Sequence, residues 1–522
     1  MTSVTPVEIT LLVLGLAVVA FMTGRIPIAI VAVGVSVMLW ATGVLTLHES
    51  LAGFGDPTVI FIASLFVVSE ALDATGVTAW AGQQAVQRGG TKRAGLLVTI
   101  CLLVALLTAL ISVNGAVAAL IPVVVVVAVR VGAPPSQMLM PLAFSAHAGS
   151  MLALTGTPVN IIVSEAAVDA GGRPFGFFEF TVVGVPLLIG TVLIIIVLGR
   201  RLLPHNEPTE LPADVAALAR ALRAGYALPE ESELMGVARG VTEVVVPPRS
   251  PLIGTHLFAG QATPSGDLVV LAVQRGGEPL TDRESTLNVG DTLLLGGTWA
   301  DLEHHTAGPE VLVVDEPATL RKAVPLGKGA RRSLVILGVM ILLLVTNVVP
   351  PAIAALLGAG AIVLSGVFSP QRAYKAVQWT TVLLVAGMIP LSVAFVKTGT
   401  ADLIADRLLG AIGDADAHVA LFAMCVLTMV LGQLISNTAT VLIMTPIAAA
   451  LSYEMHVSVM PFMMALAVAS AASFLTPVAT PANTMVMEPG AYKFGDYWKL
   501  GLPLLILFLA VAVLLVPAVW SF

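Results

Sequence analysis

The chain has 522 residues, of which 57% are hydrophobic and 11% are charged. Soluble globular domains carry about 25% charged residues, and no stretch here is basic enough to form a nucleic-acid-binding surface. Several apolar stretches approach the ~20 residues that cross a lipid bilayer. We therefore expect a polytopic α-helical membrane protein, multi-pass in the plasma (inner) membrane.

The first membrane segment covers residues 1–203. Its opening run, Thr10 to Met22, lacks the charged start and small-residue cleavage site of a signal peptide, so we expect it to stay as a membrane helix. Residues 78–90 have an amphipathic pattern typical of a helix along a membrane surface. Apolar runs predict spans near 8–22, 26–43, 57–75 and 94–111, a re-entrant hairpin near 112–130, and spans near 137–163 and 180–200.

A polar insertion, residues 204–325, follows. It carries 17 acidic and 8 basic residues and so has a net charge of −9, whereas the remaining 400 residues carry 15 and 17. Turn residues separate the apolar runs, which favours strands, and a short helix precedes them. The helix is expected at 213–224 and the strands at 241–246, 267–273, 292–295 and 311–314. Basic residues flank this soluble α/β domain, including Arg201 before it and Arg331 after it, which predicts a cytoplasmic position.

The second membrane segment covers residues 326–522 and repeats the plan of the first. Residues 400–413 are amphipathic, like 78–90. Spans are expected near 333–349, 351–368, 378–397 and 416–434, with a hairpin near 435–453 and further spans near 458–485 and 496–520. The two cysteines, Cys101 and Cys425, lie inside apolar runs, so we interpret them as packed thiols.

Polar landmarks recur at a constant offset in the two membrane segments. Thr75-Gly76 precedes Thr398-Gly399 by 323 positions, and Ser112-Val113-Asn114 precedes Ser436-Asn437-Thr438 by 324. Gly156-Thr157-Pro158-Val159-Asn160 precedes Ala479-Thr480-Pro481-Ala482-Asn483 by 323. Three landmarks at one offset indicate a duplication, and many secondary transporters consist of duplicated halves.

These recurring residues have a chemistry that suits a transport site. Proline breaks a membrane helix, and the freed carbonyls and half-helix N-termini attract Na⁺ and anions respectively. Serine, threonine and asparagine complete such a site without a full charge. Each of these residues could alternatively serve only to hold membrane helices together, but four clusters at repeat-matched positions favour a functional site.

On these motifs, the membrane segments resemble the divalent anion/sodium symporter (DASS) family of dicarboxylate, citrate and sulfate carriers. The tail Gly490 to Gly501 also resembles the last loop of that family. The resemblance implies two inverted repeats, each with a re-entrant hairpin and a broken helix, that move in an elevator-type manner within a homodimer. Substrate oxygens would meet the two hairpins, with Na⁺ bound beside them.

The candidate site residues follow from these motifs. For substrate binding they are Ser112, Val113, Asn114, Thr157, Pro158, Ser436, Asn437, Thr438, Thr480 and Pro481. For Na⁺ they are Ser112, Asn114, Gly156, Asn160, Asn437, Ala479 and Asn483. The first hairpin departs from the family pattern, because Val113 stands where the family has asparagine. Asn114 would replace it only through a one-residue shift; otherwise the first Na⁺ site is weakened or lost.

The insertion resembles the C-terminal ligand-binding module of potassium-channel regulators (RCK-C). Glu243 to Val246, Ser250 to Gly254, Asp267 to Arg275 and Leu287 to Leu295 carry this resemblance. It implies a domain that dimerises, in some cases around a cyclic dinucleotide. A structural domain without a ligand is the alternative.

The sequence thus predicts a Na⁺-coupled symporter of a small divalent anion, with sulfate first and C4-dicarboxylate second, regulated through its soluble domain. The alternative is a cation channel or a Na⁺/H⁺ antiporter with a ligand-gated regulatory module. An antiporter would need an acidic residue deep in a membrane helix, and the deep helical stretches lack one. His147 is more consistent with a packed or hydrogen-bonded core residue than with proton coupling. No enzymatic constellation is found, so catalysis is not expected.

Overall fold

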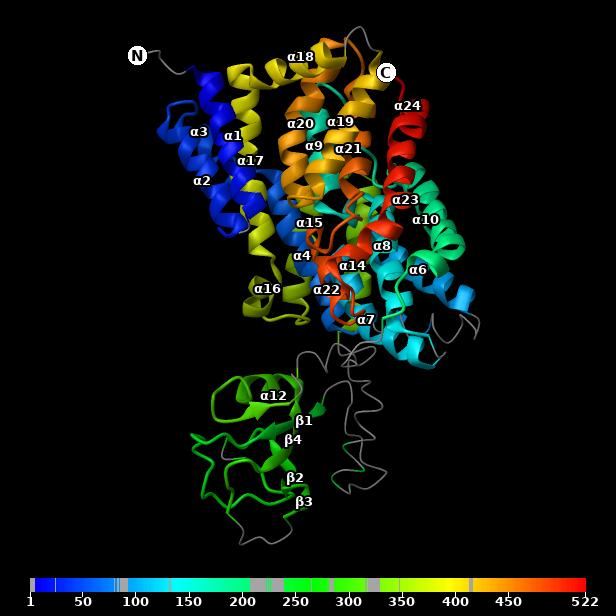
Figure 1. Ribbon diagram of the computed structural model, residues 1–522. Coiled ribbons are helices and arrows are strands. Elements are labelled where there is room, and N and C mark those ends of the chain that lie inside the picture. The colour runs from blue at the N-terminus through cyan, green and yellow to red at the C-terminus, as the bar shows by residue number, and fades with distance from the viewer. Residues whose placement is uncertain are drawn as a thin grey trace. The chain divides into compact units, whose positions relative to one another are not determined.

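The computed structural model describes residues 5–23, 25–78, 93–130, 133–206, 239–263, 265–280, 286–314, 329–346, 348–412 and 416–522, and the single positions 80, 81, 84, 222, 224, 226 and 317. The chain forms two compact units (Figure 1). One comprises Met1–Ala71, Ala85–Glu210 and Arg332–Phe522, and is helical. The other comprises Leu72–Gln84 and Leu211–Arg331, and contains the β-sheet.

The first half of the membrane segments forms nine helices in the described residues. They are α1 (Pro6–Thr23), α2 (Ile28–Ala41), α3 (Leu47–Leu51), α4 (Pro57–Ala74), α6 (Arg93–Leu110), α7 (Val113–Arg130), α8 (Leu139–Gly149), α9 (Pro158–Asp169) and α10 (Thr181–Leu202). Short 3-10 turns at Ser150–Leu152 and Leu154–Gly156 separate α8 from α9. The expected span near 137–163 is therefore a broken helix, as the Gly-Thr-Pro sequence predicts.

The second half repeats this order. Its helices are α14 (Ala330–Thr346), α15 (Pro351–Leu364), α16 (Pro370–Ala376), α17 (Trp379–Thr398), α18 (Thr400–Ile412), α19 (Ala417–Gly432), α20 (Asn437–Glu454), α21 (Val459–Ala471), α22 (Pro481–Met487), α23 (Tyr497–Ala510) and α24 (Val516–Val519). A 3-10 turn at Pro477–Ala479 separates α21 from α22, which confirms the second helix break. The helices α9 and α22 begin at prolines 323 positions apart, and α7 and α20 begin 324 apart.

Re-entrant hairpins were expected near 112–130 and near 435–453. In the structure each of these stretches is one helix, α7 and α20. Pro122 and Pro446 lie inside these helices without ending them. The non-helical links fall earlier, at Ile111–Ser112 and at the residues before Asn437. We call each link, with the first residues of the helix that follows it, an apex. The first apex joins α6 to α7, and the second joins α19 to α20.

Six helical segments are long and apolar enough to cross a membrane in the described residues, which supports a multi-pass membrane protein. They are Pro6–Thr23, Leu47–Ala74, Arg93–Leu110, Thr181–Leu202, Trp379–Thr398 and Phe494–Val519. The amphipathic helix expected at 400–413 is present as α18, which lies across the ends of the neighbouring helices (Figure 1). Its expected counterpart at 78–90 falls largely outside the described residues.

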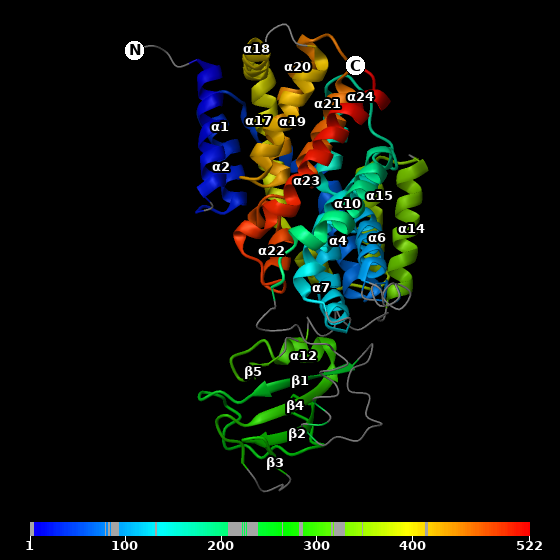
Figure 2. The same ribbon diagram turned by 45° about the vertical axis from the view of Figure 1, so that its right-hand side comes forward.

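Close helix packing joins the two halves. Figure 2 shows α1 and α2 at one edge of the bundle, beside α17. A Cβ atom on Gly387 of α17 would lie 2.6 Å from the Ala32 carbonyl oxygen of α2, so glycine is needed for this approach. The hydroxyl of Ser36 donates to the Gly387 carbonyl oxygen at 2.9 Å. Correspondingly, Gly358 of α15 lies beside Val68 of α4. Each half thus packs its second helix against the other half.

The sheet unit has the strand order β3-β2-β4-β1-β5 (Figure 2). Its strands are β1 (Arg239–Val245), β2 (Val269–Arg275), β3 (Glu278–Pro279), β4 (Thr292–Thr298) and β5 (Leu312–Val313), with the short helix α12 (Trp299–His305) after β4. All strand pairs are antiparallel. The four predicted strands are confirmed, whereas most of the predicted helix at 213–224 lies outside the described residues.

An ion pair fastens the turn before β4. Arg275 donates to both carboxylate oxygens of Asp291 at 2.8 Å, and the Asn288 backbone N–H donates to Asp291 Oδ2 at 2.8 Å. Burial alone would raise the pKa of the Asp291 carboxyl, but the hydrogen bonds from Arg275 and Asn288 outweigh burial and hold this pKa below its ordinary value. Since the folded pKa is depressed, the ion pair stabilises the sheet at neutral pH, and this contribution disappears as the pH falls through the folded pKa.

Asp291→Asn is therefore expected to destabilise the sheet at pH 7, because Arg275 loses its charged partner. Hydrogen–deuterium exchange of the β2 and β4 amides in the full-length protein measures this effect. The difference between Asp291→Asn and wild type should shrink as the pH falls through the folded pKa of Asp291. Glu303→Gln, at an exposed position on α12, is the matched control. Equal exchange in all three proteins would contradict the assignment.

Candidate functional site

Each of the four recurring motifs contains a hydroxyl side chain that caps a helix. The capped helices are α7, α9, α20 and α22. The caps are Ser112 Oγ with the Gly115 N–H (3.2 Å), Thr157 Oγ1 with the Val159 N–H (3.4 Å), Ser436 Oγ with the Ala439 N–H (3.3 Å) and Thr480 Oγ1 with the Asn483 N–H (3.3 Å). A capping hydroxyl accepts one hydrogen bond and keeps its own proton to donate. The caps therefore build local structure without excluding ligand contacts.

The asparagine of each Thr-Pro-x-Asn motif closes its helix break with the same pair of hydrogen bonds. Asn160 Nδ2 donates to the carbonyl oxygens of Ser150 and Ala153, both at 2.9 Å. Asn483 Nδ2 donates to the carbonyl oxygens of Ser473 and Thr476, at 2.8 and 3.1 Å. Both asparagines are fully buried. The partners are 10 and 7 residues earlier in both halves, so the repeat extends to individual hydrogen bonds.

Within each half, the helix break lies against the apex. In the first half Thr155 Oγ1 donates to the Ala109 carbonyl oxygen near the end of α6, at 3.0 Å. In the second half Ser473 Oγ donates to Asn437 Oδ1 at 2.5 Å. In each half, a residue near the helix break therefore contacts a residue at or near the apex.

Gln433 adds a clamp in the second half alone. Its Nε2 donates to the Ala472 carbonyl oxygen at 3.0 Å, and its Oε1 accepts from the Leu475 N–H at 3.0 Å. The repeat places Ala109 at the corresponding position, where no side chain can make these bonds. The second break is therefore held more firmly to its apex than the first.

The two halves meet at His147. This buried histidine on α8 has its Nε2 atom 3.2 Å from Asn483 Oδ1 and 3.2 Å from Thr480 Oγ1. The expectation of a packed, hydrogen-bonded core histidine is confirmed. In addition, α7 packs on α22 and α9 packs on α20, so each motif-bearing helix contacts one from the other half.

The structure also settles the register of the first apex. Val113 begins α7 just as Asn437 begins α20, 324 positions later, and Ser112 and Ser436 both cap. No one-residue shift brings Asn114 into the place of Asn437. The first half therefore lacks an amide at this position. Ser150, the counterpart of Ser473, donates instead to the His147 carbonyl oxygen at 2.8 Å.

The candidate residues differ in their access to solvent. The apex residues are half-buried, as are two residues of the first break, while the remaining break residues are buried apart from one exposed proline. Half-buried are Ser112, Val113, Asn114, Thr157, Pro158, Ser436, Asn437 and Thr438; buried are Gly156, Asn160, Ala479, Thr480 and Asn483; Pro481 is exposed. The apex side chains, Thr157, Pro158 and Pro481 are therefore the candidates with exposed surface.

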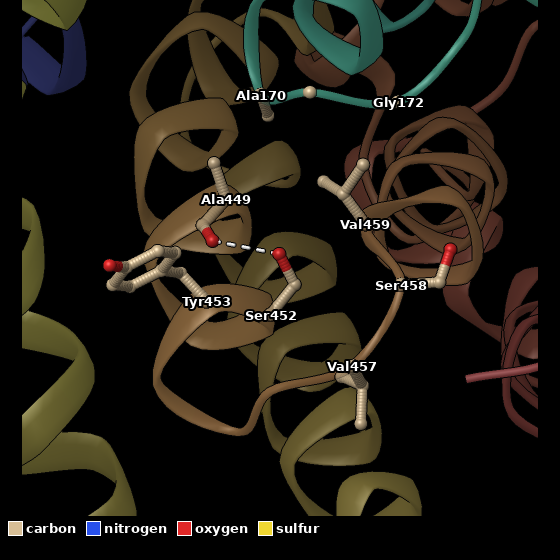
Figure 3. Close-up of a pocket in the computed structure, with 9 residues that line it drawn as sticks. Ala170, Gly172, Ala449, Ser452, Tyr453, Val457, Ser458 and Val459 are labelled. Carbon is tan, nitrogen blue, oxygen red and sulfur yellow. Dashed lines mark hydrogen bonds between the residues drawn. The ribbon is translucent and has the colours of Figure 1, made fainter.

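A cavity of about 210 Å³ lies away from these motifs, between the loop after α9 and the turn from α20 to α21 (Figure 3). Its lining consists of Ala170, Gly171, Gly172, Ala449, Ser452, Tyr453, Val457, Ser458 and Val459. No charged residue lines it, and Ser452 Oγ donates to the Ala449 carbonyl oxygen at 2.8 Å. This cavity therefore does not coincide with the predicted anion site.

Metal-binding clusters of three or more His, Cys, Asp or Glu side chains do not occur in the part of the chain that the structure describes. Cys101 and Cys425 are free, buried thiols, as expected.

Sequence reasoning missed two contributors, Ser473 and Gln433. Ser473 could have been found, because Ser150 stands at the same offset of 323 as the neighbouring motif. Gln433 has no repeated signal, since its counterpart is alanine.

The chain matches the citrate transporter family (CitMHS) over residues 18–452 and 411–522. It is 30% identical to the "Uncharacterized transporter YfbS" of Escherichia coli over 98% of both chains. It is 27% identical to the "Sodium/sulfate cotransporter 2" of Chlamydomonas reinhardtii over 52% of this chain and 32% of that protein. The YdaH transporter of Alcanivorax borkumensis has the same fold, with a TM-score of 0.51 at 15% identity over 93% of this chain and 88% of that one. The chain therefore belongs to the citrate transporter family.

Proposed function

We propose that this chain is a Na⁺-coupled symporter of a small divalent anion, with sulfate as the first candidate and a C4-dicarboxylate as the second. The observation that carries the proposal is the matched pair of helix breaks. Each break is closed by a fully buried asparagine and lies beside an apex of half-buried polar side chains. Broken helices with this arrangement form cation and anion sites in secondary transporters.

The anion would be held by neutral groups. The four motifs contain no lysine or arginine, so attraction comes from hydroxyls, amides and the positive ends of α7, α9 and α20. Bound Na⁺ would supply the remaining positive charge. This chemistry suits a symporter, because the anion then binds well only when Na⁺ is present.

Na⁺ would bind at oxygen atoms beside each apex. The first site would use Ser112, Asn114, Gly156 and Asn160, and the second Asn437, Ala479 and Asn483. Since Val113 supplies no oxygen where Asn437 does, we propose that the second site dominates coupling.

The preference for sulfate rests on named relatives. The sodium/sulfate cotransporters of Chlamydomonas reinhardtii match half of this chain at 26–27% identity. The family description names citrate, so citrate belongs among the substrates to be tested.

The two halves are proposed to be inverted repeats that work by elevator-type alternating access in a homodimer. The reciprocal packing of α2 on α17 and of α15 beside α4 supports an exchange of elements between halves. The elevator movement and the homodimer follow from the family resemblance.

The sheet unit is proposed to be a cytoplasmic RCK-C-like regulatory module that takes a cyclic dinucleotide. Such a ligand would regulate transport only by binding one transport state better than the other. Deletion of residues 204–325 should then remove any effect of the nucleotide on uptake while leaving Na⁺ dependence in place.

Uptake into proteoliposomes tests the main proposal. Labelled sulfate, succinate and citrate are supplied separately, with and without an inward Na⁺ gradient. We expect sulfate uptake that depends on the gradient. Gradient-independent uptake would contradict Na⁺ coupling, and uptake of citrate or succinate alone would contradict the choice of sulfate.

A further inference from the structure

A chain of hydrogen bonds connects the second apex to the first half of the protein. Ser473 Oγ donates to Asn437 Oδ1 at 2.5 Å, and the Ser473 carbonyl oxygen accepts from Asn483 Nδ2 at 2.8 Å. The chain ends at His147, whose Nε2 lies 3.2 Å from Asn483 Oδ1. Three side chains, together with the side chain and backbone carbonyl of Ser473, thus link α8 to the first residue of α20.

Asn483 determines which ring nitrogen of His147 carries the hydrogen. Asn483 Nδ2 donates to the two backbone carbonyls, so Oδ1 is the atom that faces His147 and it can only accept. Nε2 must therefore carry the hydrogen. Thr480 Oγ1 lies 3.2 Å from the same Nε2–H, so the imidazole also touches the cap of α22.

The first half has no equivalent chain. The counterpart of His147 is Ser470, which donates within its own helix to the Ala467 carbonyl oxygen. Asn160 Oδ1, the counterpart of Asn483 Oδ1, is fully buried and contacts no hydrogen-bond donor among the described residues. At the apex, the counterpart of Asn437 in the first half is Val113, which has no amide. The duplicated halves are therefore unequal at both ends of this connection.

We propose that His147 is a positioning residue for the transport site: through Asn483 and Ser473 its Nε2–H sets the orientation of Asn437. This inference rests on the proposed function, in which Asn437 binds Na⁺ and the anion. Without the donor, Asn483 Oδ1 becomes a buried acceptor with no partner, as Asn160 Oδ1 is in the first half. Two backbone carbonyls alone then hold the amide that closes the second break, and Ser473 and Asn437 are positioned less tightly.

The test compares His147→Gln with His147→Asn in the full-length protein. The Gln amide nitrogen reaches the place of Nε2, whereas the shorter Asn amide does not. Both variants lose the edge contact of the ring with Phe474, and they differ from each other by one methylene group. We expect His147→Asn to raise the Na⁺ concentration for half-maximal uptake by about 5- to 150-fold, and His147→Gln to stay near wild type. Ser470→Ala is the control at the repeat-matched position.

Equal shifts in the two variants would show a packing role and overturn the proposal, as would no shift in either. If wild-type uptake does not depend on Na⁺, the proposed coupling fails separately. The same comparison is then made on the anion concentration for half-maximal uptake, since Asn437 also faces the anion. The Gln variant must still match wild type and the Asn variant must not.

Discussion

Replacing Gly156 with alanine is expected to abolish transport. A Cβ atom at this position would lie 2.2 Å from the Ser150 carbonyl oxygen and 2.8 Å from its carbonyl carbon. Both are backbone atoms, so no side-chain rotation relieves the clash, and the first helix break must open. The Ser150 carbonyl oxygen also accepts from Asn160 Nδ2, so the bond that closes the break is disturbed as well. Overpacking of this kind costs typically 1–3 kcal/mol or more.

Uptake at saturating Na⁺ and anion measures this effect, together with the melting temperature in detergent. Gly360→Ala is the matched control, because a Cβ atom there meets nothing within 4 Å and alanine favours the helix. We expect Gly360→Ala to transport like wild type. Full uptake by Gly156→Ala would show that the first break is not part of the moving site.

The repeat explains why this clash with the Ser150 backbone should arise in the first half and not in the second. Ala479 stands at the counterpart of Gly156 and its Cβ is accommodated in the buried second break. The two breaks therefore share their hydrogen bonds but differ in the space around them. A site built from these two halves is therefore not symmetric. The additional hydrogen bonds of Gln433 in the second half, and Val113 in place of asparagine in the first, agree with this asymmetry.

The helix breaks and the strands could be predicted because their signals are local. Gly-Thr-Pro interrupts an otherwise apolar run. In the insertion, turn residues separate the apolar runs that form the strands. The chain reversals could not be predicted, since Ile111–Ser112 contains no glycine or proline and both flanking helices are apolar. Pro122 and Pro446 lie inside α7 and α20, where each helix continues in spite of one lost hydrogen bond.

The hydrogen bonds inside the candidate site could not be predicted from the sequence either. Asn160 and Asn483 were identified by their repetition, but their partners are backbone carbonyls, which any residue can supply. The contact of His147 with Asn483 joins residues 336 positions apart, and no repeat signal connects them. The motifs thus predicted a candidate site, whereas the hydrogen bonds within it depend on the packing of α8 against the second break.

Asn437→Ala is expected to abolish Na⁺-dependent uptake while leaving the protein folded and assembled. Alanine suits the first turn of α20, whose cap comes from Ser436 and not from Asn437. The substitution removes the amide that accepts from Ser473 Oγ, and this amide is half-buried and open to a solute. Val113 occupies the corresponding place in the first half, so that half has no amide at the equivalent position.

Labelled-anion uptake with and without a Na⁺ gradient measures the loss, and size-exclusion chromatography checks assembly. Ser452→Ala, at the other end of the same helix, is the control, since Ser452 Oγ donates only to the Ala449 carbonyl oxygen one turn earlier. Wild-type uptake by a well-expressed Asn437→Ala protein would contradict the site assignment. Loss of Na⁺ dependence with retained anion uptake would show that Asn437 holds the cation alone, and that the anion is bound by the helix N-termini.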